Sequence, residues 1–395
     1  MELHNRFNHT YIIGATGAGK STLLKHIILT DIHNGDGVFF IDPHGHDTND
    51  IIGRIPAHRR NDVILFDPSD YDFPIPWNPL QGVSDEACPF VSSTIVDTIK
   101  DAWGYSGVTT PTLDQYLFNT TFALIQAKQP LLGMKFMLTR ASYRTRVLES
   151  VFDPIILDFW LNDFEDMSQK DKRDTTRSTL NKIGALVSDA RIRNILGQTS
   201  SAFQFAQIID NRKIFLARLP QGKLGLQKTK LIGSLLLTQL HLALLSRTTT
   251  TPFHVHIDEV HHFAGSTLAE MLSGVRKFNA SLTIVHQYLD QLSRPVQASV
   301  LGNVGTKILF RVSRKDAEQL NDLMGTNNLL SELHVLPRFH ARIVESEKID
   351  ERMIDVELPP YDNDMAVKII AATRRHFAKD RVKVEGYIKR FIERA

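Results

Sequence analysis

The residues best suited to chemistry lie in a glycine-rich stretch near the start of the sequence. The stretch fits the pattern G-x-x-x-x-G-K-[ST] and reads Gly14, Ala15, Thr16, Gly17, Ala18, Gly19, Lys20 and Ser21. Glycines let consecutive backbone N–H groups converge on phosphate oxygens, and a helix that starts there adds the positive end of its dipole. Lys20 would neutralise the β- and γ-phosphate oxygens, and the Ser21 hydroxyl would bind Mg²⁺. Together with Thr22, the stretch predicts a binding site for ATP and Mg²⁺.

A pair of carboxylates supplies the second half of this chemistry. Asp258 and Glu259 directly follow the apolar run 253–257, which has the pattern of a buried strand. Asp258 would orient Mg²⁺, and Glu259 would polarise the water that attacks the γ-phosphate. An acidic pair at a strand end is common and by itself does not indicate a site. It supports one here because the glycine-rich loop needs an acidic partner on a neighbouring strand. The two motifs together predict hydrolysis of ATP rather than binding alone.

Both motifs require a sheet that places them at one edge. Short apolar runs without polar alternation are typical of strands in a parallel sheet covered on both faces. Such runs lie at residues 11–13, 38–41, 63–66, 214–219, 253–257, 282–285 and 308–312. Amphipathic segments separate them, beginning with a helix predicted at 22–29 after the glycine-rich loop. The sequence therefore predicts an α/β fold with a mostly parallel central sheet.

A long segment in the first half of the chain has no strand-like runs. Its apolar residues recur at spacings of three and four, as at Leu113 and Leu117, which is typical of helices. We therefore predict an all-α domain inserted into the α/β domain. The predicted parts are 1–83 (first part of the α/β domain), 84–210 (insertion), 211–358 (second part of the α/β domain) and 359–395 (basic helical tail).

The charge of the chain is nearly balanced except in this tail. Lys and Arg number 46 against 44 Asp and Glu, so the net charge is only +2 and any contact with nucleic acid must be local. Residues 366–395 carry nine Lys or Arg against three Asp or Glu, a net charge of +6. Two interpretations of this segment stay open: a solvated helix, or a tail that binds nucleic acid or a partner.

Three features indicate where the protein works. Cys88 is the only cysteine, which excludes an intrachain disulfide framework and fits a reducing compartment. The longest apolar run, 231–245, is shorter than the about 20 residues that a bilayer span requires, so we interpret it as a buried helix. The first residues show no basic leader followed by an apolar segment. We expect a cytoplasmic protein without a membrane span of its own, which a partner could recruit to the inner face of the membrane.

Closely spaced histidines suggest metal binding at first sight. They are His44, His46, His254, His256, His261 and His262. Alternate histidines on a strand point to one face, where they commonly pack or form hydrogen bonds, and no helical carboxylate–histidine motif accompanies them. We therefore expect no zinc site. Asp42 and His44 follow a predicted strand near the glycine-rich loop and could contact Mg²⁺ or water.

Four segments together resemble the FtsK/HerA class of ring ATPases. They are 11–21, 39–45, 257–259 and 282–287. Within this class the chain is most similar to the TraG/TraD-type coupling proteins of type IV secretion and conjugation, over about Asn8 to Ile343 and including the position of the helical insertion. The resemblance implies a RecA-like P-loop motor domain with an inserted all-α domain. It also implies a hexameric ring with ATP bound between subunits.

The resemblance assigns two further site residues. Gln287 matches the polar residue that senses the γ-phosphate in this class. Arg276 matches the arginine that such rings offer to the nucleotide of the neighbouring subunit, where a guanidinium would neutralise charge on the γ-phosphoryl oxygens. Coupling proteins usually carry membrane helices, and HerA proteins a β-barrel, before the motor domain. Here the glycine-rich loop begins at residue 14, so membrane attachment is expected to come from a partner or to be absent.

These expectations favour a motor that hydrolyses ATP and moves DNA, or a DNA–protein complex, through the pore of a ring. DNA binding would be independent of sequence, and a relaxase, another DNA-processing protein or a secretion channel would be the partner. Two alternatives stay open. One is an ATPase that drives a secretion channel without gripping DNA, and the other is a HerA-like defence or packaging motor. Stimulation of ATP turnover by DNA separates the motor from the first alternative.

Overall fold

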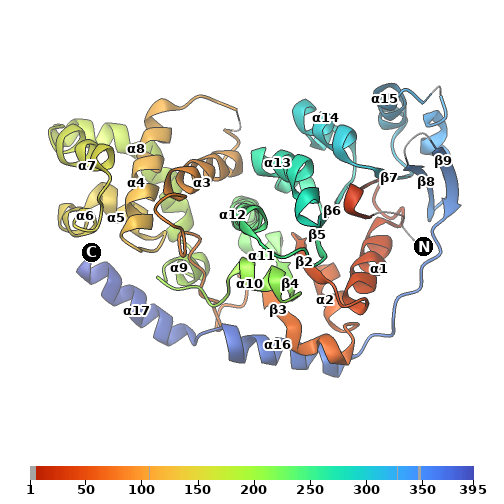
Figure 1. Cartoon of the computed structure of the whole chain (residues 1–395), viewed down its shortest axis with the longest axis horizontal. Coiled ribbons are helices and arrows are strands. Elements are labelled where there is room, and N and C mark those ends of the chain that lie inside the picture. The colour runs from red at the N-terminus through yellow and green to blue at the C-terminus, as the bar shows by residue number, and fades with distance from the viewer. Residues whose placement is uncertain (1–5, 106, 327, 346–347) are drawn as a thin grey trace. The chain divides into compact units, whose positions relative to one another are not determined.

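The computed structural model describes residues 6–105, 107–326, 328–345 and 348–395 (Figure 1). Contacts between residues divide the chain into two compact units, each built from segments far apart in sequence. The sheet unit comprises Met1–Phe66, Phe205–Gly222 and Leu240–Thr373. The helical unit comprises Asp67–Gln204, Lys223–Gln239 and Arg374–Ala395.

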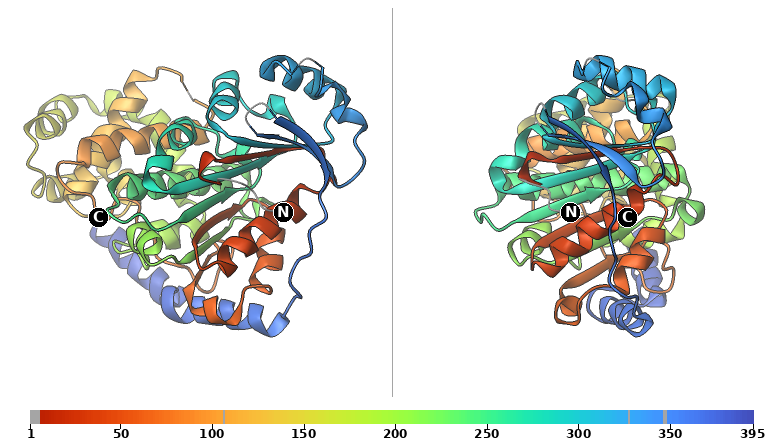
Figure 2. Two further views of the ribbon diagram at one scale, coloured as in Figure 1. Left: turned by 45° about the vertical axis from the view of Figure 1, so that its right-hand side comes forward. Right: turned by 90° about the vertical axis from the view of Figure 1, so that its right-hand side faces the viewer.

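A single sheet organises the first unit. Its nine described strands are β1 (Thr10–Ile13), β2 (Gly37–Asp42), β3 (Val63–Phe66), β4 (Ile214–Arg218), β5 (Phe253–Ile257), β6 (Ala280–His286), β7 (Thr306–Phe310), β8 (His340–Glu345) and β9 (Lys348–Met353). They lie in the order β3-β4-β2-β5-β6-β1-β7-β8-β9 (Figure 2). Pairing is parallel from β3 to β7, and β8 and β9 continue it as antiparallel strands at one edge. The predicted mostly parallel sheet is confirmed.

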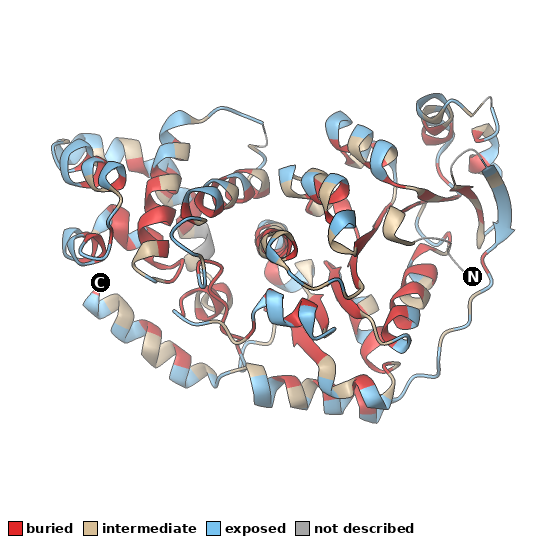
Figure 3. Ribbon diagram, in the orientation of Figure 1, coloured by how far each residue is buried: buried red, intermediate tan, exposed pale blue. Residues whose placement is uncertain are grey.

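Helices cover both faces of this sheet. They are α1 (Lys20–His33), α2 (His46–Ile52), α10 (Phe205–Asp210), α13 (Ser266–Gly274), α14 (Arg294–Asn303) and α15 (Arg314–Met324). The chain moves from β1 to β2 in one direction along the sheet and from β5 to β6 in the other. Because crossovers between parallel strands are right-handed, α1 and α13 lie on opposite faces. The strands between them are buried almost throughout (Figure 3).

The start of the predicted basic tail belongs to the core of the sheet unit. Helix α16 (Asn363–Phe377) begins there, and its Met365, Ala366 and Ile369 pack in the same buried cluster as Leu24 and Ile28 of α1. Their burial shows that this part of the tail is not a solvated helix. Apolar residues at helical spacing, rather than the high charge, decide how it packs.

The helical unit is built around aromatic side chains. Its helices are α3 (Cys88–Ala102), α4 (Pro111–Gln126), α5 (Gly133–Thr139), α6 (Ala141–Leu148), α7 (Pro154–Asp158), α8 (Gln169–Val187), α9 (Ala190–Leu196) and α17 (Arg381–Arg394). Trp160 is fully buried, with its ring 5.1 Å from that of Phe164. In α17, Phe391 stacks edge-on against Phe136 and Tyr143. The second half of the tail therefore also packs against the protein.

The observed division differs from the predicted boundaries. The helical unit begins at Asp67 rather than at residue 84, and α10 falls in the sheet unit rather than in the insertion. The helical unit also takes in residues 223–239 and 374–395, which the composition assigns to the α/β domain and to a separate tail. The insertion is therefore completed by segments that follow it in sequence.

One helix of the described residues is long and apolar enough to cross a bilayer. This is α12 (Leu226–Ser246), a helix of 21 residues that contains the predicted apolar run 231–245 and extends beyond it at both ends. Its most apolar window is 61% buried inside the protein, as the interpretation of a buried helix requires. A mostly buried core helix passes the same test of length and composition, so the helix is weak support for a membrane span. The short helix α11 covers Gln221–Leu224.

Candidate nucleotide-binding site

The predicted site residues other than Arg276 meet at the carboxyl ends of β1, β5 and β6, because β6 lies between β5 and β1 in the sheet. In the register of the parallel pairs, Ile257 of β5 lies beside Ile284 of β6, and Ile13 of β1 lies beside His286 of β6. Asp258 and Glu259 follow the carboxyl end of β5, Gln287 follows that of β6, and the glycine-rich loop follows that of β1. Ligands of open α/β sheets bind at this kind of edge.

The loop adopts the conformation that its glycines permit. Gly17 and Gly19 have φ angles of +76° and +122°, which strain any residue with a Cβ atom. A Cβ on Gly14 would lie 2.5 Å from the Cβ of Phe310 in β7. Helix α1 then starts at Lys20 with Gly19 as its N-cap, so no side chain covers its first N–H groups. An anion can therefore approach the end of this helix.

Lys20 lies within the loop rather than in solvent. Its Nζ donates hydrogen bonds to the carbonyl oxygens of Gly14, at 2.6 Å, and Ala15, at 3.1 Å. Burial lowers the pKa of this ammonium, and the negative charges of Glu259 and Asp258 oppose that shift. The loop thus holds a cation where phosphate oxygens would bind, with hydrogen bonds that a phosphate could replace.

Asp258 lies in a pocket of negative charge. Its side chain is buried, and burial together with the neighbouring charges of Glu259, Asp42 and Asp47 raises its pKa well above the usual value. Gathering carboxylates in a buried place is unfavourable unless a cation joins them. With the Ser21 hydroxyl, this donor set of hard oxygen atoms fits Mg²⁺.

Asp47 is a member of this set that the sequence analysis did not identify. It lies in the first turn of α2, near enough to Ser21 for that side chain to affect its pKa, and 3.6 Å from the Nζ of Lys25. Burial and the charge of Asp42 raise its pKa, while Lys25 and Ser21 lower it, and the net shift is upward. No motif marks this residue; the only signal is an acidic residue soon after a strand of the same sheet.

Asp42 and His44 have local partners. The Asp42 carboxylate accepts hydrogen bonds from the backbone N–H groups of His44, Gly45 and Thr48 at 2.7–2.9 Å, which fixes the turn from β2 into α2. The His44 ring lies 3.3 Å from the amide nitrogen of Gln221. Asp42 therefore has a structural role that places Asp47 beside Ser21.

Glu259 lies in a network with Gln287 and the loop. Gln287 Nε2 donates to Glu259 Oε1 at 2.6 Å, and Thr16 Oγ1 donates to Gln287 Oε1 at 3.1 Å. The Nδ1 atom of His261 lies 3.3 Å from Glu259 Oε2. Burial raises the pKa of Glu259, but the contacts with His261 and Gln287 outweigh it, and the net effect lowers the pKa to about 2. Glu259 is therefore ionised, as a general base must be.

Arg276 does not join these residues. It is exposed, in the short helix Val275–Phe278 that leads into the amino end of β6, and its charge acts on His9, just before β1. The seven residues of β6 separate it from Gln287, a length of about 20 Å at roughly 3.3 Å per residue. Arg276 therefore lies at the amino ends of the strands, whereas the loop of its own chain lies at their carboxyl ends.

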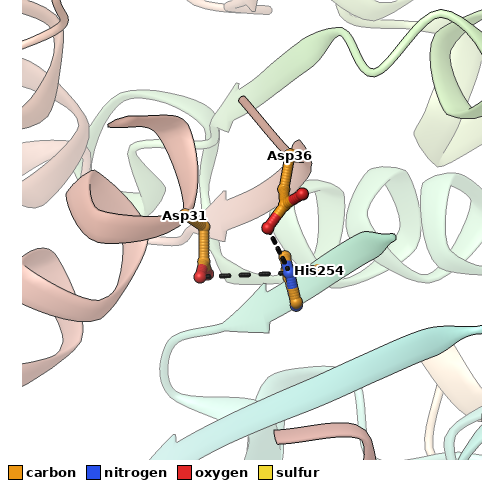
Figure 4. A group of neighbouring side chains, drawn as sticks. All are labelled: Asp31, Asp36 and His254. Atoms are coloured by element: carbon orange, nitrogen blue, oxygen red, sulfur yellow. Dashed lines mark hydrogen bonds and ion pairs between the residues drawn. The ribbon is translucent and has the colours of Figure 1, made fainter. Parts of the chain in front are cut away.

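His254 of β5 lies beside Asp31 and Asp36 near the amino end of the strand (Figure 4). His254 Nε2 lies 3.2 Å from Asp36 Oδ2 and 3.9 Å from Asp31 Oδ1, and His256 Nε2 lies 3.0 Å from Asp31 Oδ2. Asp31, Asp36 and His254 are close enough together to hold a metal ion. However, Arg6 pairs with Asp31 and already supplies a positive charge. We interpret the cluster as a buried ion-pair network.

Comparisons with known proteins give matches only at the level of structure. No family model matches the chain, and no curated protein matches its sequence. The plasmid coupling protein TrwB in complex with ADP and Mg²⁺ matches with a TM-score of 0.66 and 15% identity, covering 91% of this chain and 88% of that chain. TrwB in complex with the ATP analogue ADPNP gives 0.63 and 15%, covering 90% and 87%. VirB4 of Thermoanaerobacter pseudethanolicus gives 0.59 and 16%, covering 88% and 89%.

These matches extend over both units of the chain. At 15–16% identity they show a shared fold, and two of the matched TrwB structures hold ADP with Mg²⁺ or ADPNP. The similarity to coupling proteins that the four sequence segments predict is thereby confirmed at the level of the fold. The chain has the P-loop α/β fold with an added helical unit that is seen in the bacterial conjugative coupling protein TrwB.

Proposed function

We propose that the protein is an ATP-hydrolysing motor of the coupling-protein type, which translocates DNA or a DNA–protein complex. The observation that carries the proposal is the meeting of Lys20, Asp258, Glu259 and Gln287 at one edge of the sheet. A loop that only binds nucleotide does not need an ionised glutamate beside the position of the γ-phosphate. Here Glu259 is linked through Gln287 to Thr16 of that loop.

Each residue has a role in this reaction. The loop and the first turn of α1 bind the phosphates, and Lys20 neutralises the oxygens of the β- and γ-phosphates. Ser21 and Asp258, with Asp47 beside them, would hold Mg²⁺, which supplies positive charge to the phosphates when bound. Glu259 takes the proton of the attacking water, and Gln287 orients the groups around it.

The transport of DNA and a hexameric ring are further parts of the proposal. Their support is the fold shared with a conjugative coupling protein and the position of Arg276, which is exposed and far from the loop of its own subunit. An arginine there contributes to hydrolysis only in an assembly that places it against a neighbouring loop. A relaxase or a secretion channel remains the expected partner, on the cytoplasmic side of a membrane.

The fold similarity to VirB4 supports a second candidate, an ATPase that drives a secretion channel without gripping DNA. The deciding experiment measures ATP turnover without nucleic acid, with single-stranded DNA and with duplex DNA, alongside the mass of the assembly. The DNA motor requires stimulation by one of the DNAs, and binding that weakens steeply with salt because the contacts are made to phosphates. Turnover that no DNA changes, at any salt concentration, favours the second candidate.

A further inference from the structure

Gln287 connects the tip of the glycine-rich loop to the proposed general base. Its Oε1 atom accepts from the Thr16 hydroxyl at 3.1 Å, and its Nε2 atom donates to Glu259 Oε1 at 2.6 Å. The loop and the base thus share one side-chain amide. Thr16 is exposed, so neither burial nor core packing explains the position of its hydroxyl.

Two features show that Glu259 is held rather than free. Its Oε1 atom accepts a hydrogen bond from Gln287 at 2.6 Å, whereas its buried Oε2 atom lies 3.3 Å from His261 Nδ1 and makes no hydrogen bond within the described part of the chain. The backbone of Glu259 has φ and ψ of 45° and 51°, a left-handed conformation that side chains with a Cβ atom rarely adopt. Such a conformation persists where the surroundings enforce it, and it is found most often at functional sites.

We propose that Thr16 and Gln287 form a latch that holds Glu259 until a nucleoside triphosphate enters the loop. This proposal rests on the proposed function, since it concerns the same site. In the latched state the Gln287 amide is bound to the carboxylate. A γ-phosphate in the loop is a competing anion for this amide and repels the carboxylate. Binding of the triphosphate therefore moves Gln287 from Glu259 to the phosphate and frees the Oε1 atom of Glu259 for the attacking water.

The latch makes Thr16 a positioning residue that acts through Gln287. Its hydroxyl keeps the amide turned so that the N–H groups face Glu259. A triphosphate must break these contacts when it binds. The free energy of the contacts is therefore subtracted from its binding free energy, and its affinity for the protein is lower. A diphosphate carries no γ-phosphate and leaves the latch closed. The latch thus weakens the binding of ATP relative to ADP.

The test compares Thr16→Val, which has the same shape without the hydroxyl, with Thr16→Ser, which keeps the hydroxyl. The full chain is titrated calorimetrically with ADPNP and with ADP in the presence of Mg²⁺. We expect Thr16→Val to raise the ratio of the ADPNP affinity to the ADP affinity about three- to tenfold, the value of one net hydrogen bond. Thr16→Ser should keep the wild-type ratio of the two affinities. A variant whose affinity for both nucleotides falls equally, or whose ADPNP affinity alone falls, overturns the latch.

A double-mutant cycle identifies the route of the effect. Because Thr16 acts only through Gln287, adding Thr16→Val to a Gln287→Ala protein should change the ADPNP affinity by less than about twofold. The full gain in that background overturns the proposal. If the wild type binds ADPNP and ADP but the variants Thr16→Val and Thr16→Ser behave alike, the latch is wrong while the proposed function stands. If the wild type binds neither nucleotide, both are wrong.

Discussion

Arg276 and Lys20 lie at opposite ends of two neighbouring strands in the same sheet. Lys20 follows the carboxyl end of β1, whereas Arg276 precedes the amino end of β6, and the two strands are parallel neighbours. A single subunit therefore separates the two cationic side chains that the proposed chemistry uses. In the proposed motor, Arg276 can therefore serve a nucleotide only in an assembly that brings it to the loop of a neighbouring subunit.

Changing Lys20 to Ala should abolish most ATP turnover. The ammonium is the only cation that hydrogen-bonds to the loop itself among the described residues, through the Gly14 and Ala15 carbonyls. Without it the loop offers only backbone dipoles to the β- and γ-phosphate oxygens, so the rate should fall by about a hundredfold or more. Turnover is measured by phosphate release. A variant with a wild-type rate would show that the loop does not bind the phosphates in this way.

Changing Glu259 to Gln should have a different effect, since it removes the base and keeps the shape. We expect ADPNP to bind within a few-fold of the wild-type affinity, while hydrolysis falls by about a hundredfold or more. Titration with ADPNP and a single-turnover measurement separate the two effects. Hydrolysis at the wild-type rate would show that Glu259 is not the base.

Changing Asp258 to Asn should stabilise the protein without ligands. The buried carboxylate is surrounded by Glu259, Asp42 and Asp47, and its raised pKa shows that its charged form is disfavoured. Removing the charge should add about 1 to 2 kcal/mol of stability, or roughly 2 to 5 °C in the melting temperature measured with EDTA. The same variant should lose the dependence of nucleotide binding on Mg²⁺. Destabilisation instead would show that the carboxylate is paired within the protein.

The seven parallel strands could be predicted because a strand buried on both faces is a continuous apolar run. The antiparallel pair could not. β9 reads Lys348, Ile349, Asp350, Glu351, Arg352 and Met353, and it is exposed along most of its length. An edge strand of this kind has no apolar run, so its place in the sheet follows from pairing with β8 rather than from its own composition.

The candidate site likewise contains residues that the sequence could predict and residues that it could not. Lys20, Asp258 and Glu259 could be predicted because motifs and strand ends mark them. Asp47 and His261 could not, since they reach the site through the turn that Asp42 fixes and through the short helix Val260–His262 that follows Glu259. The spacing of residues within a motif can be read from a sequence. The approach of a side chain from another loop depends on the folded backbone.

Changing Ile388 to Ala should destabilise the helical unit. Ile388 of α17 is 3% exposed, and a Cβ on Gly197 would lie 2.4 Å from its Cδ1 atom, so the two positions are closely packed. Loss of the side chain leaves a cavity and should cost about 2 to 4 kcal/mol in urea unfolding. The neighbouring Lys389 is exposed, and Lys389→Ala is the matched control, with an expected change below about 0.5 kcal/mol. Equal effects of the two changes would argue that α17 is a solvated helix.

Changing Arg276 to Ala tests whether the residue acts across a subunit boundary. The variant should still bind ADPNP and assemble as the wild type does, because Arg276 is exposed and lies far from the loop of its own chain. Hydrolysis should fall by about a thousandfold, the scale for an arginine supplied in trans to the γ-phosphoryl group.

Mixing two inactive variants then decides between action in trans and action within one subunit. In assemblies of Arg276→Ala and Lys20→Ala subunits, some interfaces pair an intact loop with an intact Arg276 from the neighbour. Such interfaces should restore part of the wild-type turnover, and the recovery should peak near equal amounts of the two variants. Assembly of mixed rings is checked by two different tags on the subunits. Mixed rings without any recovery would show that Arg276 does not complete the site of a neighbouring subunit.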